Sequence, residues 1–139
     1  MEPSLSSGDT AWVLVCSALV LLMTPGLAFF YGGLVGRNNV ITIMMQSFVS
    51  LGVTTIVWYT IGFSLAFSGG EGDVIGNLDH VFLNDVSIAD AYSGDGSIPT
   101  LLFFVYQMMF AVITPALIIG AFAERAKFST FLVFTVLWV

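Results

Sequence analysis

The sequence predicts an all-α integral membrane protein, and two observations carry this prediction. The 139 residues are 58% hydrophobic and only 9% charged, with a mean hydropathy of +0.99, whereas a soluble domain usually carries about 25% charged residues. The apolar residues are also grouped in runs, three of which exceed the roughly 20 residues that a helix needs to cross a bilayer. We therefore expect three complete transmembrane helices and the beginning of a fourth.

The predicted spans follow from the lengths of these runs. We expect the first span at about residues 11–35, the second at about 40–67 and the third at about 98–123. The first run is too long for the core of a signal peptide and no basic residue precedes it, so we expect it to be retained as a helix. A fourth, incomplete run at residues 128–139 covers roughly 18 Å of helix, against a hydrocarbon core of about 30 Å. The sequence is therefore expected to stop partway through its fourth span.

The positive charges predict the orientation in the membrane. Arg37 follows the first run, and Arg125 and Lys127 lie between the third and the fourth. The loop at residues 68–97, between the second and third runs, has Glu and Asp residues but no Lys or Arg. Because Lys and Arg accumulate in cytoplasmic loops, we expect a multi-pass protein of the cell (plasma or inner) membrane with its amino terminus and the 68–97 loop outside.

Composition also excludes several classes of function. Three dispersed cations in a chain of net charge −6 cannot neutralise a phosphate backbone, so nucleic acid is not an expected partner. The single cysteine, Cys16, excludes an intramolecular disulfide and a cysteine-based metal cluster, and the lone His80 has no second His or Cys beside it. No nucleophile–base pair and no phosphate-binding loop is visible. We therefore expect neither an enzyme nor a cofactor.

Several polar and conformationally special residues lie inside the first two spans. Pro25 followed by Gly26 removes one helical hydrogen bond, so we expect a helix break that faces protein or a water-lined cavity, with a simple packing kink as the alternative. Gly32 and Gly36 form a Gly-x-x-x-Gly pair, which favours the close approach of another helix. A polar group in the second span consists of Gln46, Ser47, Ser50 and Thr54. Hydrogen bonds between helices explain this group better than pore lining does.

The third span has the residue pattern that most strongly indicates a functional face. Four of its residues share one helical face by their spacing: Phe103, Gln107, Phe110 and Thr114. Tyr106 lies on an overlapping stripe, and Pro115 is expected to break the helix directly after this face. An aromatic stripe by itself usually means packing. An amide deep in a membrane helix points towards protein or a solvated path, however, and aromatic faces attract cations that have shed water. The combination therefore favours a pore-lining face.

Two blocks of the sequence resemble the ammonium transporter (Amt/Mep/Rh) family, in its Amt/Mep branch. The first is TPGLAFFYGGLV at residues 24–35, followed by Asn39-Val40 and by Met44-Met45-Gln46. The second is QxxFAxIT at residues 107–114, followed by GAFAER at residues 120–125 and by Phe128-Ser129. Both blocks occur at the spacing of the family, and the resemblance covers essentially the whole chain after Gly8.

The resemblance implies an eleven-helix bundle with an inverted repeat, assembled as a homotrimer with one pore in each subunit. Residues 1–139 would be the amino-terminal third of one such membrane domain. The implied function is ammonium transport for nitrogen uptake: ammonium is recruited at an outer aromatic vestibule, loses a proton and passes a hydrophobic pore as ammonia. The implied partners are ammonium or ammonia (with methylammonium as an analogue), the lipid bilayer and a PII-type regulatory protein on the cytoplasmic side.

The resemblance also assigns three site residues. Phe110 matches the outer of two stacked gating phenylalanines and contributes to ammonium recruitment. Tyr106 matches an aromatic neighbour one turn outwards, and Gln107 matches an amide on the side of the vestibule. The family's recruitment Trp and Ser, its second gating Phe, the Asp of its fifth span and its two pore histidines match positions beyond this sequence, and Trp138 lies too early to be the recruitment Trp. Two other classes stay open: an ammonium-sensing membrane domain of a signalling protein, and a non-transporting fragment.

Overall fold

The computed structural model describes residues 5–69, 75–88, 90–92 and 96–139, so residues 70–74, 89 and 93–95 of the predicted outer loop lie outside the described residues. Helices account for most of this part of the chain, and no strand is present in it apart from one isolated bridge between Ala91 and Pro99. The elements are α1 (Ser7–Leu34), α2 (Val40–Val57), the π-helical turn η1 (Trp58–Gly62), α3 (Phe63–Phe67), the 3₁₀ turn η2 (Val81–Leu83), α4 (Thr100–Phe122) and α5 (Phe128–Trp138).

Three of the helical segments are long and apolar enough to cross a membrane. They are α1, the continuous segment Val40–Phe67 and α4, while α5 is a shorter apolar helix. The predicted all-α membrane class is therefore confirmed. The first helix begins four residues earlier than the sequence predicted, because Ser6 caps it: the Ser6 Oγ accepts a hydrogen bond of 3.3 Å from the backbone N–H of Asp9. Asp9 itself lies in the first turn, where the helix dipole favours a negative charge.

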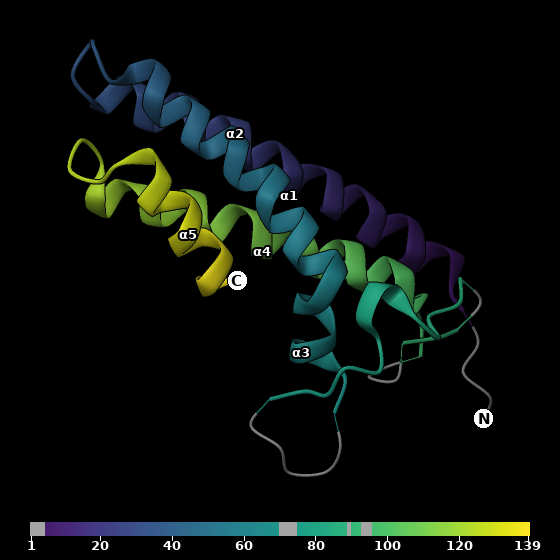
Figure 1. The fold of residues 1–139 in the computed structure, drawn as a ribbon. Helices are drawn as coiled ribbons and strands as arrows, with labels where there is room; N and C mark the ends of the chain where they lie inside the picture. The colour runs from purple at the N-terminus through teal and green to yellow at the C-terminus, as the bar shows by residue number, and fades with distance from the viewer. Residues whose placement is uncertain (1–4, 70–74, 89, 93–95) are drawn as a thin grey trace.

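The helices form a bundle whose two ends differ in charge (Figure 1). The turn at residues 35–39 and the turn at residues 123–127 lie at one end, and they contain all three Lys and Arg residues. The beginning of α1 and the loop before α4 lie at the other end, where the Ser6 N–H donates a 2.8 Å hydrogen bond to the Ser97 carbonyl. The structure therefore places both cation-bearing turns on the same side, as the positive charges predicted.

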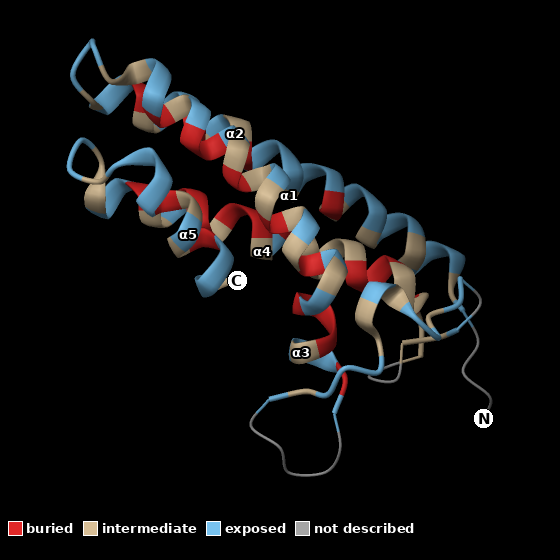
Figure 2. Ribbon diagram, in the orientation of Figure 1, coloured by how far each residue is buried: buried red, intermediate tan, exposed pale blue. Residues whose placement is uncertain are grey.

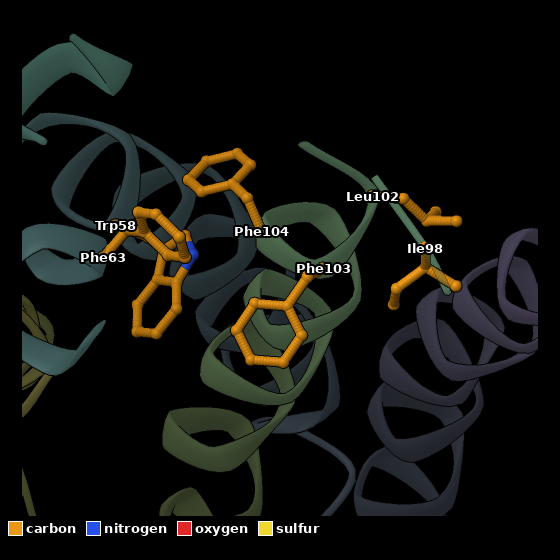
Figure 3. Packing of buried hydrophobic residues seen from close by; sticks show 6 residues of the cluster. All are labelled: Trp58, Phe63, Ile98, Leu102, Phe103 and Phe104. Atoms are coloured by element: carbon orange, nitrogen blue, oxygen red, sulfur yellow. The ribbon is translucent and has the colours of Figure 1, made fainter. Parts of the chain in front are cut away.

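Buried residues lie where the helices face one another, and the outer faces are exposed (Figure 2). Many of the exposed residues are large and apolar. Trp12 is 70% exposed and Leu137 is 81% exposed, which is the pattern expected of faces that meet lipid or further helices. One apolar cluster, near the loop end of α4, consists of Trp58, Phe63, Ile98, Leu102, Phe103 and Phe104 (Figure 3). A second cluster, near the cation-bearing turns, consists of Ile43, Ala116, Ile119 and Phe131.

Neither proline interrupts its helix, so the predicted breaks at Pro25 and Pro115 are wrong. α1 and α4 run continuously through these two residues. The φ angle of proline suits an α-helix, although each proline removes one helical hydrogen bond. Membrane helices tolerate such a loss inside a bundle. The irregularity lies instead in the second span, where the backbone N–H of Phe63 bonds to the Trp58 carbonyl across a π-helical turn. A Cβ at Gly62 would lie 3.1 Å from the indole of Trp58, so glycine there leaves room for the ring.

The polar group of α2 faces the interior, but within the described part of the chain its hydrogen bonds do not reach other helices as predicted: Gln46 Oε1 and Thr54 Oγ1 have no partner. Gln46, Ser47, Ser50 and Thr54 are all at most 3% exposed. The Ser47 hydroxyl donates to the Ile43 carbonyl at 3.2 Å, and the Ser50 hydroxyl donates to the Ser47 carbonyl at 2.9 Å. A short hydroxyl side chain reaches a carbonyl of its own helix more easily than a group across a helix interface.

Glycine does permit close contacts, as the sequence predicted. A Cβ at Gly32 would lie 3.3 Å from the Met44 side chain of α2, which is tighter than ordinary packing. Gly36 lies beyond the end of α1, and a Cβ there would lie 3.1 Å from a carboxylate oxygen of Glu124. The close approach of helices at Gly32 is therefore confirmed, whereas Gly36 makes room for a side chain of the opposite turn.

Glu124 joins the two cation-bearing turns. Its Oε1 accepts hydrogen bonds of 2.9 Å from the Gly36 backbone N–H and of 2.9 Å from the Asn39 side-chain amide. The Asn39 side chain first, and the Gly36 N–H second, lower the pKa of Glu124 below its ordinary value. Because the folded-state pKa is the lower one, this carboxylate contributes to stability at and above its ordinary pKa, and the contribution is lost as the pH falls through the folded-state value.

Candidate functional site

A cavity of about 260 Å³ lies beside the face of α4 that the sequence singled out. Gln107, Phe110 and Thr114 line it together with Ala111, and Trp58 of η1 and Trp138 and Val139 at the end of α5 complete the lining. The spacing of the three α4 residues places them on consecutive turns of one helix face. The structure therefore brings two of the three predicted site residues, Phe110 and Gln107, to one cavity.

Tyr106, the third predicted site residue, contacts Phe110 rather than the cavity. The two ring centroids are 5.1 Å apart and the rings are nearly perpendicular, at 82°. Such an edge-to-face pair is a favoured arrangement of aromatic rings. Phe110 remains 40% exposed, so most of its surface is buried while part of its ring is accessible from the cavity. Tyr106 therefore supports the ring of Phe110 from the next turn of α4.

Phe103, which shares the same spacing, belongs to the apolar cluster and does not line this cavity. Its ring stacks on Tyr92 of the outer loop, with the centroids 3.8 Å apart, and meets Phe67 edge-on at 4.8 Å (Figure 3 shows Phe103 within the cluster). The predicted face of α4 is thus divided: its first turn packs against the outer loop, and its later turns line a cavity.

Two features of hydrogen bonding along α4 occur at residues that line the cavity. Pro115 has no N–H, so the carbonyl of Ala111, one turn earlier, has no helical donor from that position. Ala111 is one of the residues that line the cavity. The hydroxyl of Thr114 donates a 2.6 Å hydrogen bond to the Phe110 carbonyl. The proline thus acts here by freeing an acceptor beside the cavity, although it does not break the helix.

Trp58 is a lining residue that the sequence reasoning missed. It is 8% exposed, and its indole N–H has no hydrogen-bond partner among the described residues. Its ring meets Phe63 and Phe67 edge-on, each at 6.2 Å. The available signal was its position four residues after Thr54, which continues the buried face of α2 by one more turn.

Trp138, which the sequence comparison had set apart from the family's recruitment Trp, also borders this cavity and is 46% exposed. The cavity thus combines a phenyl ring, two indoles and a carboxamide. Aromatic faces attract a cation by about 0.5–1 kcal/mol at exposed sites and by about 2 kcal/mol when water is excluded. The carboxamide oxygen of Gln107 can accept a hydrogen bond. This set of groups suits a small cation that donates hydrogen bonds.

Comparison with known proteins identifies relatives along nearly the whole chain. The family model described as Ammonium Transporter Family matches residues 11–139. The ammonium transporter of Bacillus subtilis (strain 168) is 48% identical over 131 residues, an alignment that covers 94% of this chain and 32% of that protein. The ammonium transporter of Mycobacterium tuberculosis (strain ATCC 25618 / H37Rv) is 44% identical over 145 residues, covering 94% of this chain and 30% of the relative.

Solved structures agree with these sequence matches. The crystal structure of Saccharomyces cerevisiae Mep2 superimposes with a TM-score of 0.84 at 35% identity, covering 96% of this chain and 30% of that one. Candida albicans Mep2 gives a TM-score of 0.82 at 30% identity, with 96% and 29% covered. The chain therefore spans about a third of the length of the relatives that it matches.

Proposed function

The chain belongs to the ammonium transporter family, and we propose on this basis that it takes part in ammonium transport across a cell membrane. It is a multi-pass membrane protein, as its apolar helices and its relatives indicate. The observation that carries the proposal is the cavity beside α4, because ammonium, for which the family is named, is a small cation, and the cavity offers aromatic faces together with the carboxamide of Gln107.

In the proposed mechanism, the cavity recruits ammonium from the outer side. Phe110 presents its ring to the cation and closes the outer pore, Gln107 accepts a hydrogen bond from it, and Tyr106 holds the ring of Phe110. Ammonium then loses a proton, and neutral ammonia crosses the hydrophobic pore. Potassium has no proton to lose and would have to cross as an ion, at a cost of several kcal/mol in an apolar pore. Deprotonation therefore separates two cations that size alone separates poorly.

The larger assembly is part of the same proposal. Residues 1–139 form the amino-terminal part of one eleven-helix membrane domain, and three such domains form a homotrimer. The protein lies in the plasma or inner membrane, with methylammonium as a substrate analogue and a PII-type protein as a partner on the cytoplasmic side. The lengths of the relatives support a longer membrane domain, because the chain covers only 32% of the Bacillus subtilis protein.

Transport by the full-length protein tests the function directly. Reconstituted in liposomes, it should move ammonium and methylammonium down an imposed gradient, while potassium at the same concentration should produce no flux above that of empty liposomes. Equal fluxes of ammonium and potassium would contradict deprotonation before passage. Binding of ammonium without any flux would favour a sensor instead.

We also propose that the amino terminus and the 68–97 loop face outward. The support is that both cation-bearing turns lie at the opposite end of the bundle. Two variants in a Cys16→Ala background test this. The Asp90→Cys variant should react with an impermeant thiol reagent added outside intact cells, and the Asn38→Cys variant should react only when the reagent is added from inside. Labelling of both positions from the same side would refute this topology.

A further inference from the structure

A second cavity, of about 210 Å³, lies at the loop end of the bundle and is separate from the cavity beside α4. Its walls come from α3 and from the outer loop. The side chains that give it its chemistry are Phe63, Phe67, His80, Asp85, Asp90 and Tyr92. We refer to it as the loop cavity.

Hydrogen bonds hold the walls of the loop cavity in place. Ser64 at the start of α3 donates from its hydroxyl to the Asn77 carbonyl at 2.8 Å and accepts from the His80 N–H at 3.1 Å. These bonds place the His80 ring 6.4 Å from the ring of Phe63. On the opposite wall, the Tyr92 N–H donates to the Ile98 carbonyl at 2.9 Å, while the Tyr92 ring stacks on Phe103. The aromatic walls are therefore anchored to the helices.

Two carboxylates give the loop cavity its negative character, and His80 is the one basic side chain among its lining residues. Asp85 and Asp90 line it, and the 68–97 loop contains no Lys or Arg, since all three cations lie at the other end of the bundle. The Asp85 carboxylate accepts a hydrogen bond of 3.2 Å from the Asn84 amide, and the Asp90 carboxylate accepts one of 3.0 Å from the Ser87 N–H. Both donors are neutral, so neither hydrogen bond brings a positive charge to the two carboxylates, and the cavity favours a cation.

The remaining walls favour an organic cation over a metal ion. Aromatic rings attract weakly hydrated cations such as alkylated ammonium groups. A divalent metal needs several close oxygen or nitrogen ligands. Within the described residues, no three His, Cys, Asp or Glu side chains come together as such a ligand set. Phe67, which is 42% exposed, offers part of its ring to the cavity.

We propose that the loop cavity binds a small quaternary ammonium cation, in which all four substituents on nitrogen are alkyl groups. The rings of Phe67 and Tyr92 contact its alkyl groups, and Asp85 and Asp90 supply the compensating charge. This inference goes beyond ammonium transport, because it concerns a cation that has no proton to lose and a site that shares no lining residue with the cavity beside α4.

Tetramethylammonium tests the proposal, because it carries a charge but has no N–H. The full-length protein in nanodiscs of zwitterionic phosphatidylcholine should bind radiolabelled tetramethylammonium saturably, with a dissociation constant on the order of 1 mM. A neutral molecule of similar shape, tert-butanol, should not displace it at equal concentration. Lack of saturable binding, or equal displacement by tert-butanol, would overturn the proposal.

Matched variants locate the site. Asp85→Asn combined with Asp90→Asn should weaken binding by about 10-fold, because it removes both negative charges of the cavity. Asparagine is chosen because it keeps a hydrogen-bond acceptor and tolerates the left-handed backbone of residue 85 (φ 56°). Asp79→Asn removes an exposed carboxylate of the same loop that does not line the cavity, and it should leave affinity within about twofold.

Two further outcomes distinguish binding in the loop cavity from diffuse attraction by the loop and from binding in the cavity beside α4. Equal weakening by Asp79→Asn would mean a diffuse attraction of the loop and would refute the loop cavity as the site. Phe110→Ala should leave tetramethylammonium binding unchanged, and loss of binding there would place the cation in the cavity beside α4. A melting temperature equal to that of the wild type shows that the aspartate variants are folded. This control does not depend on ammonium flux, so transport can fail while the binding result stands.

Discussion

Phe110→Ala in the full-length protein is expected to weaken ammonium recruitment by roughly 5- to 30-fold, which corresponds to a cation–π contribution of about 1–2 kcal/mol. The ring of Phe110 lines the cavity beside α4 and is 40% exposed. Removing a fully packed core Phe costs about 3–5 kcal/mol of stability. Because Phe110 is only partly packed, the free energy of unfolding should fall by clearly less than that.

Phe103→Leu is the matched control, since it changes an aromatic residue of the same helix that packs in the apolar cluster. This variant should lower stability through the lost stacking on Tyr92 and leave ammonium flux per folded protein unchanged. Melting of the assembled protein and ammonium flux should be measured on the same preparations. A Phe110→Ala protein with reduced stability but wild-type flux and selectivity would remove Phe110 from the site.

Gly76→Ala is expected to displace the outer loop and to lower the free energy of unfolding by about 3 kcal/mol or more. A Cβ at this position would lie 2.5 Å from the Ser64 carbonyl and 2.7 Å from the Leu65 carbonyl, and closest of all to the Ser68 carbonyl. These are backbone atoms of the end of the second span, so no side chain can rotate away. The 2.7 Å hydrogen bond from the Gly76 N–H to the Leu65 carbonyl should be lost as well.

Gly69→Ala is the control for this prediction, because a Cβ there would make only an ordinary contact of 3.4 Å with Gly76. Denaturant unfolding in detergent and limited proteolysis of the 68–97 loop measure the two effects. Gly76→Ala should expose the loop to protease and lower the unfolding midpoint, while Gly69→Ala should resemble the wild type. Equal stability of the two variants would show that the loop does not pack on the second span at Gly76.

Local properties of the sequence determined the class of this protein and the positions of its helices. The apolar runs predicted residues 40–67 and 98–123 as spans, and the structure has helical segments at Val40–Phe67 and Thr100–Phe122. Hydrophobicity and helical periodicity are properties of neighbouring residues, so they can be read without knowing the fold. The same periodicity predicted that Gln107, Phe110 and Thr114 would face one side, and they line one cavity.

Only the tertiary structure decided which contacts these faces make. Phe103 has the spacing of the cavity face, yet its ring stacks on Tyr92 of the outer loop and packs in the apolar cluster. Trp58 joins the cavity from another helix, and Glu124 bonds to Gly36, which lies 88 residues earlier in the chain. The hydroxyls of α2 and the prolines of α1 and α4 also differed from expectation. Hydrogen bonds and ring contacts depend on which groups meet in space, and a residue's partner in a folded bundle is set by the packing of whole helices rather than by its neighbours in the chain.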